Sequence, residues 1–363
     1  MPPLEGHHVL DLSLLLPGPL CTQILRDMGA RVTKIEPPPP GDYGALWPPM
    51  VGAVSATYFA LNRGKEILSL NLKDDDDRRR LLDLAASADV VVEGFRPGVI
   101  DKLGIGYQQL AQRNPGIVLC SISGYGQSGP YAARAGHDLN YQALAGVLSL
   151  TGGSEAMPPN PPIQVADTAA GSYAAAMLIL AALVERQRTG HGRHIDVSMS
   201  EQLLPLLTPI YAIAAAEGRN PKRDGELLTG GAPCYRMFRT SDGQYVSVGG
   251  LEPKFWQAMV HAMGLSHLAD VSHLVGPAAD EVSQELARVF VTRTRDEWAE
   301  ILAPADACCE PVLLLGEVAG HAHWRARGSF ESVATPDGGT LEVPRMPASL
   351  AGFDHSSGGT KPN

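Results

Sequence analysis

The segment HHVLDLSLLLPGPLCTQILRDMGARVTKIE, residues 7–36, establishes the class of fold. Two short β-rich runs, at 7–13 and 30–36, flank a helical pattern at 19–29. Short runs of apolar and β-branched residues favour strands, whereas a longer run with a three- or four-residue apolar period favours a helix. The segment therefore predicts a strand, a helix and a second strand, as in a parallel sheet.

The same alternation continues to about residue 200. Further strands are expected at 66–72, 89–95, 117–123 and 194–200, and further helices at 76–88 and 168–187. Strands that alternate with helices are typical of a parallel sheet covered on both faces. We predict an α/β fold in which residues 1–220 form a large, Rossmann-like domain.

After residue 220 the pattern becomes that of a smaller domain. PKRDGELLTGGAP (221–233) has the composition of a linker, and CYRMFRTSDGQYVSVGG (234–250) predicts a hairpin that turns at Asp-Gly. We expect a small α+β domain at 225–320 and a turn-rich tail, 325–363, that returns to the large domain. Helical patterns within the small domain lie at 254–264, 282–293 and 295–305.

The composition argues against several classes of protein. The formal net charge of −10 disfavours sequence-independent nucleic-acid binding, which needs a basic surface. The five cysteines lack the spacing of a zinc site and are typical of a reducing compartment. The N-terminus does not resemble a signal peptide, and the longest apolar run, 174–184, is too short to span a bilayer. We expect a cytoplasmic protein without a metal and without membrane or nucleic-acid partners.

GYGQSG (124–129) formally matches the dinucleotide-binding pattern G-x-G-x-x-G. That pattern signals a nucleotide site only where it follows the first strand and opens a helix. Here it follows the fifth expected strand, and Pro130 comes directly after it. We interpret it as a tight glycine loop, and not as a nicotinamide site.

Two segments carry acid–base side chains. RAGHDLNYQALAG (134–146) places His137 beside Asp138, and QVADTAAGSYAAAMLILAAL (164–183) places Asp167 where an apolar helix begins. Taken singly, His137 is consistent with an ordinary residue of a turn. Asp167 is likewise consistent with an ordinary helix N-cap. The functional alternative is a carboxylate in an apolar pocket whose pKa is set by its neighbours.

Two basic loops follow expected strands. LSLNLK (68–73) ends in Lys73, and EGFRPGVIDKLG (93–104) carries Arg96 and Lys102. Ligands of open α/β sheets bind beyond the carboxyl ends of the strands, where both loops lie. A cation in each loop suits a phosphate-bearing ligand, although exposed loop lysines are also common without one.

The motifs, taken in order, resemble one family. They are VLDLSLLLPGPLCTQILRDMGARVTKIE, LNRGKEILSLNLK, ADVVVEGFRPGVIDKLGIGY, SISGYGQSGPYAARAGHDLNYQALAGVLSLTG, ADTAAGSYAAAMLILAALVERQRTGHGRHIDVSM, LLTGGAPCYRMFRTSDGQYVSVGGLEPKFW and DACCEPVLLLGEV. This set is similar to the class III CoA-transferase and α-methylacyl-CoA racemase family. The resemblance implies an enzyme of acyl-CoA thioesters, an interlocked homodimer, and no cofactor beyond the CoA moiety of the substrate.

The resemblance also implies roles for individual residues. Asp167 corresponds to the catalytic aspartate of the family. Gly230 and Gly231 fall in the loop that approaches the acyl group, and Glu252 matches a carboxylate of the racemase site. The implied CoA-binding residues are Leu70, Asn71, Leu72, Lys73, Gly94, Phe95, Arg96, Lys102, Gly136 and Tyr141.

Position 137 separates the two reactions of the family. The transferase branch usually has an aromatic residue there, and its aspartate attacks the thioester. The racemase branch has histidine within GHD-x-NY, as in residues 136–141 of this chain. Inversion of an α-carbon needs a base on one face and an acid on the other. We therefore expect a 2-methylacyl-CoA racemase that uses His137 and Asp167, with Asp138 and Glu252 orienting His137.

Alternatives remain open. A CoA-transferase would use Asp167 as a nucleophile, and the Thr-Ala-Ala-Gly sequence after Asp167 is closer to that branch. A CoA-binding protein without turnover is a second alternative. The Pro37–Pro40 run stands where many members of the family have a basic residue near the CoA phosphates, so a cation of the family is replaced by proline here.

Overall fold

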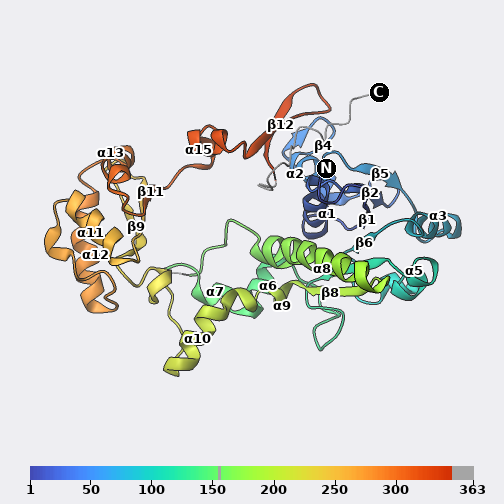
Figure 1. Cartoon of the computed structure of the whole chain (residues 1–363), viewed down its shortest axis with the longest axis horizontal. Coiled ribbons are helices and arrows are strands. Elements are labelled where there is room, and N and C mark those ends of the chain that lie inside the picture. Colours follow the sequence, from blue (N-terminus) through green and yellow to red (C-terminus); the bar gives the residue numbers. More distant parts are fainter. Residues whose placement is uncertain (154–156, 346–363) are drawn as a thin grey trace. The chain divides into compact units, whose positions relative to one another are not determined.

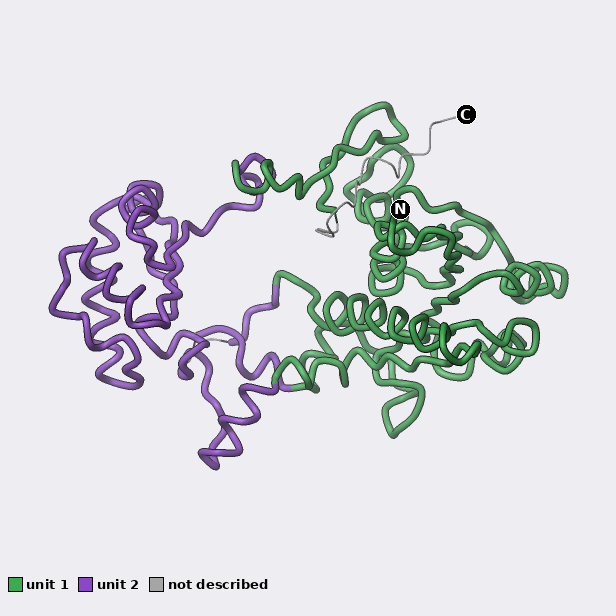
Figure 2. The backbone as a smooth tube through the Cα atoms, in the orientation of Figure 1, with its two compact units in different colours: residues 1–145, 162–207, 322–363 green, residues 146–161, 208–321 purple. Residues whose placement is uncertain are grey.

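The computed structural model describes residues 1–153 and 157–345, which form two compact units (Figures 1 and 2). The first unit contains residues 1–145, 162–207 and the described part of the segment after 321. The second contains the described parts of 146–161 and residues 208–321. The described parts of 146–161 and residues 208–220 thus group with the second unit, whereas the sequence had suggested the large domain. Of the tail expected at 325–363, the part after 345 lies outside the described residues.

The first unit is built on a parallel sheet whose six strands lie in the order β5-β2-β1-β6-β7-β8. This order is that of a doubly wound sheet. Successive strands are added outward from β1 to β5 on one side and from β6 to β8 on the other, so the order of addition reverses between β1 and β6. All six strands lie within the predicted ranges, so the α/β prediction is confirmed. They are β1 (His8–Leu12), β2 (Arg31–Glu36), β5 (Glu66–Ser69), β6 (Val90–Glu93), β7 (Val118–Ser123) and β8 (His194–Ser198).

Helices cover both faces of this sheet. On one face α3, α4 and α5 enclose an apolar core that includes Leu10, Val91 and Leu119. On the other, α1 packs on β1, β2 and β6, and α8 packs on β7 and β8. The helices of this unit are α1 (Pro17–Asp27), α2 (Ala56–Asn62), α3 (Asp75–Ala85), α4 (Val99–Lys102), α5 (Tyr107–Arg113), α6 (Asp138–Ala145), α8 (Ala174–Thr189), α9 (Met199–Gln202) and α15 (Ala322–Ala326).

The predicted helix at 168–187 begins with an unusual turn. Residues Ala166–Tyr173 form a π-helix, and α8 continues from it without a break. The combined segment, Ala166–Thr189, is long and apolar enough to cross a membrane by length and composition. The uninterrupted apolar run at 174–184 had seemed too short to span a bilayer, whereas the whole helical segment is long enough. Core helices pass the same test, and Ala175, Ile179 and Leu183 of α8 are buried within the unit.

Two small hairpins complete the first unit. Strands β3 (Met50–Val51) and β4 (Val54–Ser55) form one, and β12 (Phe330–Ala334) and β13 (Thr340–Pro344) form the other. The second hairpin was not predicted, because that segment showed no clear period. It is joined to the unit by Arg63, whose Nε lies 2.7 Å from Glu331 Oε1.

The second unit is a small α+β structure around its own core. Asp242 and Gly243 form the expected turn between β9 (Tyr235–Arg239) and β10 (Tyr245–Gly249), and Gly243 has the required positive φ of 78°. Trp256 and Phe290 are fully buried in its core. Further elements are α7 (Val147–Leu150), α10 (Thr208–Glu217), α11 (Pro253–Ala262), α12 (Pro277–Phe290), α13 (Arg295–Leu302), β11 (Cys309–Pro311) and α14 (Leu315–Val318). The predicted helices at 254–264, 282–293 and 295–305 are confirmed by α11, α12 and α13.

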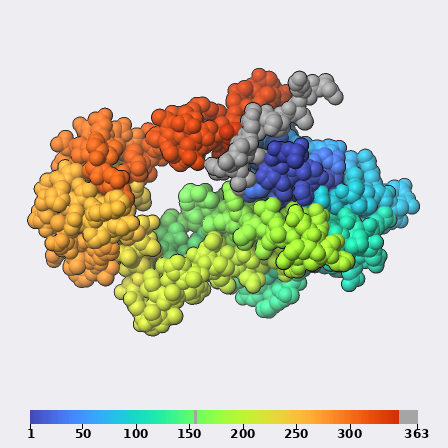
Figure 3. All heavy atoms as spheres, in the orientation of Figure 1, coloured from blue at the N-terminus to red at the C-terminus, as the bar shows by residue number. Residues whose placement is uncertain are grey.

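Helix α10, which has no buried residue, lies on the surface (Figure 3).

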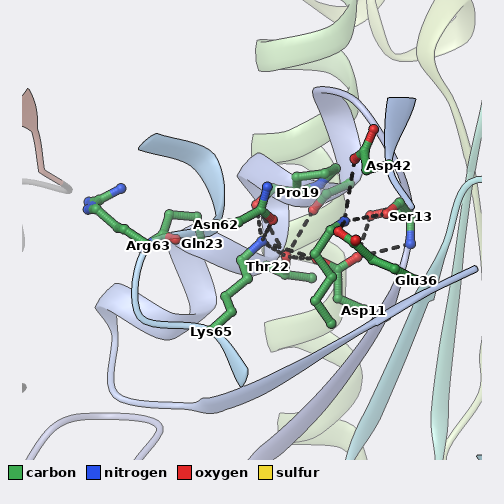
Figure 4. A network of polar contacts seen from close by, with 12 residues as sticks. Asp11, Ser13, Pro19, Thr22, Gln23, Glu36, Asp42, Asn62, Arg63 and Lys65 are labelled. Atoms are coloured by element: carbon green, nitrogen blue, oxygen red, sulfur yellow. Dashed lines mark hydrogen bonds and ion pairs between the residues drawn. The ribbon is translucent and has the colours of Figure 1, made fainter. Parts of the chain in front are cut away.

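A cluster of buried charges lies beside the end of β1 in the first unit (Figure 4). The side chains of Asp11, Lys34 and Lys65 are fully buried. Lys65 Nζ donates to Asp11 Oδ2 at 3.1 Å, to Thr22 Oγ1 at 2.8 Å and to Asn62 Oδ1 at 3.0 Å. Burial alone would raise the pKa of Asp11, but the two ammonium groups hold it well below its usual range. We call Asp11, Lys34, Asp42 and Lys65 the buried ion cluster.

Removal of one cation from the buried ion cluster is expected to destabilise the protein strongly. Lys65→Met leaves Asp11 buried beside an apolar side chain, and breaking a buried pair in this way costs about 3–5 kcal/mol. Chemical denaturation of this variant and of the exposed-lysine control Lys254→Met measures the difference. The double variant Asp11→Asn/Lys65→Met is expected to recover part of the loss. Equal stability of Lys65→Met and the control would contradict this assignment.

Candidate functional site

His137 stands directly before α6 and is held there by its own backbone. Asn140 Oδ1 accepts the N–H of His137 at 3.0 Å, and the carbonyl of His137 accepts the N–H of Asn140 at 2.8 Å. The Asn140 side chain thus satisfies the His137 N–H as the third helical residue of a capping box does, while the turn itself is closed by the backbone. The imidazole itself is exposed, so it is available to a ligand of the first unit.

Asp138 joins the start of α6 to the start of the Asp167 helix. Its Oδ1 accepts the N–H of Ala166 at 2.8 Å and that of Asp167 at 3.1 Å, and its Oδ2 accepts from Gln142 Nε2. We had expected Asp138 to orient His137, and the structure corrects this. Both carboxylate oxygens take other partners, because the first N–H groups of a helix need external acceptors.

The same contacts bear on how an oxyanion could be stabilised. Backbone N–H groups at the start of a helix are common donors to an oxyanion. The N–H groups of Ala166 and Asp167 already donate to Asp138. Asp138 therefore acts as a clamp that places His137 and Asp167 at two neighbouring helix starts.

Asp167 is the second residue of the π-helix, whose N-cap is Val165. The alternative of an ordinary N-cap aspartate is thereby excluded. The residue is half-buried, and burial together with the nearby charge of Asp138 raises its pKa to about 7. A carboxyl group with this pKa can both take up and release a proton near neutrality. π-Helical turns occur frequently at functional sites.

Tyr141 supports the loop before His137 from within the first unit. Only 5% of its surface is exposed, and its hydroxyl donates to the carbonyl of Gly136. A Cβ at Gly124 would lie 2.4 Å from the Tyr141 ring, and one at Gly136 would lie 2.8 Å from it. Gly124 of the GYGQSG loop thus packs against a tyrosine. Tyr141 had been expected to close over CoA, and its buried ring is instead a support for the Gly136 backbone.

The expected CoA-binding residues of the first basic loop follow β5. Leu70 is 1% exposed and belongs to the apolar core, so its side chain cannot meet a ligand as the resemblance had implied. Asn71 donates its N–H to Asp77 Oδ2 at 2.7 Å, and its Oδ1 accepts the N–H of Lys73 at 3.2 Å. These bonds order the loop and leave Asn71 and Lys73 exposed, with Leu72 half-buried.

The second basic loop follows β6, beside the point where the strand order reverses. A Cβ at Gly94 would lie 3.7 Å from Ser13 Cβ, so the ends of β1 and β6 meet there. Gly94, Arg96 and Lys102 are exposed and Phe95 is half-buried. Ligands of doubly wound sheets bind at this point.

Glu93 was missed by the sequence analysis. It is 1% exposed, and its Oε2 accepts the N–H of Phe95 at 2.6 Å, which shapes the second basic loop. Burial raises its pKa to about 7, against the opposing hydrogen bonds from Ser121 and Phe95. Its signal in the sequence was a carboxylate that ends a strand of buried valines.

Asn140 and Gln142 were missed as well, although each lies one helical turn from the residue it supports.

Three expected site residues belong to the second unit. Gly230 has a positive φ of 102°, and a Cβ there would lie 2.0 Å from Asp224 Oδ1. A Cβ at Gly231 would lie 2.5 Å from the backbone of Gly225, so both positions require glycine. Gly230 lines a cavity of about 430 Å³ together with Tyr235, Met237 and Cys308. Glu252 is exposed at the start of α11, and its pairing with His137 stays a prediction.

Comparisons with known proteins give the family. The family model described as CoA-transferase family III matches residues 4–363. The chain is 38% identical to human alpha-methylacyl-CoA racemase over 90% of its own length and 82% of the relative. It is 34% identical to acetyl-CoA:oxalate CoA-transferase of Acetobacter aceti over 97% and 90% of the two chains.

A solved structure agrees with this result. The crystal structure of a CAIB/BAIF family protein from Brucella suis superimposes with a TM-score of 0.83 at 31% identity, over 97% of this chain and 93% of that one. Racemases and transferases therefore both stand among the relatives of this chain. The chain belongs to CoA-transferase family III, the family of enzymes that its ordered motifs resemble.

Proposed function

We propose that the protein is an acyl-CoA racemase that inverts the α-carbon of 2-methylacyl-CoA thioesters. The observation that carries the proposal is the Asp138 clamp, which joins the helix start beside His137 to that of Asp167. The Asp167 carboxyl group has a pKa of about 7. This carboxyl group and the imidazole of His137 are two groups that can exchange the roles of acid and base. Alpha-methylacyl-CoA racemases among the relatives agree with this choice.

The reaction follows from the chemistry of the thioester. One of the two bases removes the α-proton, the thioester becomes an enolate, and the conjugate acid of the other base returns a proton to the opposite face. For the other enantiomer the two residues exchange roles. The enolate oxygen needs hydrogen-bond donors. The first-turn N–H groups of α6, at Asp138 and Leu139, suit this role because no intrahelical acceptor is available to them.

The remaining parts of the proposal concern binding and assembly. Arg96, Lys102 and Lys73 would hold the phosphates of CoA, and Glu252 would orient His137. We propose a homodimer, a cytoplasmic location and no cofactor beyond the CoA moiety of the substrate. Size-exclusion chromatography with light scattering tests the assembly.

Chiral analysis tests the reaction. A single enantiomer of a 2-methylacyl-CoA is incubated with the protein, the thioester is hydrolysed, and the acid is resolved by chiral chromatography. The proposal predicts a racemic product at equilibrium and no dependence on an added free acid. A product that keeps its configuration while CoA appears on an added acid would contradict it.

CoA transfer is the second candidate function. It is favoured by acetyl-CoA:oxalate CoA-transferase, a relative whose 34% identity is close to that of the racemases. In this reaction the Asp167 carboxylate would attack the thioester carbonyl, giving an acyl-aspartyl anhydride and CoA thiolate. The thiolate then attacks the aspartyl carbonyl, which releases the first acid and leaves an aspartyl-CoA thioester. The carboxylate of the acceptor acid attacks this thioester to form a second anhydride, and CoA thiolate takes the new acyl group and frees the Asp167 carboxylate. Trapping with hydroxylamine during turnover would convert Asp167 to a hydroxamate, detectable by mass spectrometry.

Asp138→Asn is expected to change the pH dependence of the reaction. The negative charge of Asp138 helps to keep the pKa of Asp167 at about 7, so its removal lowers that pKa. In the direction where Asp167 is the base, kcat/KM of the wild type rises through about pH 7 as the carboxyl group ionises. The rise should move to lower pH in Asp138→Asn, whose amide oxygen can still accept the two backbone N–H groups. An unchanged profile, or a shift to higher pH, would show that Asp138 does not act on Asp167 in this way.

A further inference from the structure

A buried hydroxyl connects the Asp167 turn to the loop after β1. Ser172 is fully buried, and its Oγ lies 2.7 Å from the carbonyl oxygen of Pro17 and 3.0 Å from that of Asp167. Both oxygens are acceptors, so the single hydroxyl proton of Ser172 is shared between them. In a π-helix the carbonyl of Asp167 faces the residue five positions later, which is Ser172.

Pro17 is the first residue of α1, and the buried ion cluster holds the loop directly before it, residues 13–16. Lys34 Nζ donates to the carbonyl of Ser13 at 2.6 Å and lies 3.7 Å from Asp42. Asp42 in turn accepts the N–H of Leu15 at 2.9 Å. Leu15 has a φ of 66°, a conformation that costs free energy for a residue with a side chain and persists only where its surroundings fix it.

Pro17 at the start of α1 packs closely against Gly171 of the π-helix. A Cβ at Gly171 would lie 3.1 Å from Pro17 Cβ, 3.1 Å from Met199 Sδ and 3.3 Å from the carbonyl oxygen of Ala166. A displacement of Pro17 would therefore be passed to the turn that carries Asp167. The sheet and Asp167 are therefore connected in three steps. The buried ion cluster fixes the loop before α1, Pro17 packs against Gly171, and the Ser172 hydroxyl bonds to both Pro17 and Asp167.

We propose that Ser172 is a positioning residue, which holds the Asp167 turn in register against the start of α1 at Pro17. The inference rests on Asp167 being the reacting carboxyl group, as in the proposed function. It applies to racemisation and to CoA transfer alike, because both reactions need that carboxyl group in one place. A displacement of about 1 Å at a reacting group can lower a rate about a hundredfold.

Ser172→Ala tests the inference, with Ser172→Thr as the variant that keeps a hydroxyl. Thr189→Ala is the matched control, because the Thr189 hydroxyl also donates to backbone carbonyls but at the far end of α8. We expect Ser172→Ala to lower kcat about ten- to a hundredfold while KM and the thermal unfolding temperature stay close to wild type. Ser172→Thr should recover activity, and Thr189→Ala should keep it.

Two results would overturn the inference. One is a wild-type kcat in Ser172→Ala. The other is a loss of activity that is matched by a rise in KM and a lower unfolding temperature, as a purely structural serine would give.

A readout without turnover separates this inference from the proposed reaction. Carbon-13 NMR of labelled aspartate, assigned with Asp167→Asn, follows the titration of the Asp167 carboxyl group. The positioning role predicts a different midpoint in Ser172→Ala and an unchanged one in Thr189→Ala. If the protein catalyses neither reaction but the midpoint still shifts, the proposed function fails and the positioning role stands. Equal midpoints in all three proteins would refute the positioning role.

Discussion

Asp167→Asn is expected to abolish inversion of 2-methylacyl-CoA, with a loss of about 10²–10⁴ in kcat if the residue acts as an acid–base catalyst. The amide has nearly the same shape, and the backbone N–H of Asp167 would still reach Asp138. The variant therefore removes the titrating group and leaves the helix start intact. Steady-state rates measured from each enantiomer give the loss, and the KM for the thioester should change little.

The control for this variant is an aspartate on the surface. Asp83 is exposed and pairs with Arg113 at 2.6 Å, and none of its polar contacts within residues 1–153 and 157–345 reaches the helix starts beside His137 and Asp167. Asp83→Asn should keep wild-type rates. If Asp167→Asn also kept them, the assignment of Asp167 as a reacting group would be wrong for both candidate reactions.

His137→Gln is expected to have the second large effect, and a selective one. Without the imidazole, inversion should fall by about 10²–10⁴, because one face of the α-carbon loses its acid or base. Asp167 can still exchange the α-proton of one enantiomer with solvent, so deuterium uptake should persist for that enantiomer alone. Proton NMR at the α-carbon of each enantiomer, incubated separately in D₂O, measures this selectivity.

The exposed histidine His261 in α11 supplies the matched control. His261→Gln should invert and exchange both enantiomers at wild-type rates. Full inversion by His137→Gln would remove His137 from the reaction. CoA transfer that survives in His137→Gln but not in Asp167→Asn would favour the transferase, in which the histidine only lines the site.

The fold could be predicted because the central strands of its sheet, such as β1, β6 and β7, are buried on both faces. Such strands appear in the sequence as short apolar runs between helical patterns, and VVVE of β6 is one of them. The hairpin β12–β13 was missed, because both strands are short and only partly buried, and only β13 alternates between apolar and polar residues. The local sequence shows clearly which strands are buried. It shows much less clearly which partly buried strands pair with each other.

The site could be predicted only in part, for a different reason. His137 and Asp167 stood out as titratable residues beside apolar segments, yet the sequence could not show what Asp138 would contact. Its partners are backbone N–H groups 28 and 29 residues further along the chain. The π-helical turn was equally hidden, since its residue Gly171 packs closely against Pro17 and Met199, which are distant in the sequence. Contacts of this kind arise from the tertiary fold and leave no periodic trace.

Stereospecific deuterium incorporation tests the two-base proposal most directly. One enantiomer of a 2-methylacyl-CoA is incubated with the wild-type protein in D₂O, and the first product and the recovered substrate are separated and analysed by mass spectrometry. Two bases on opposite faces predict one deuterium at the α-carbon of the inverted product, with less in the recovered substrate at early times. Retained configuration with no deuterium, in the presence of active CoA transfer to an added acid, would contradict the racemase and identify a transferase.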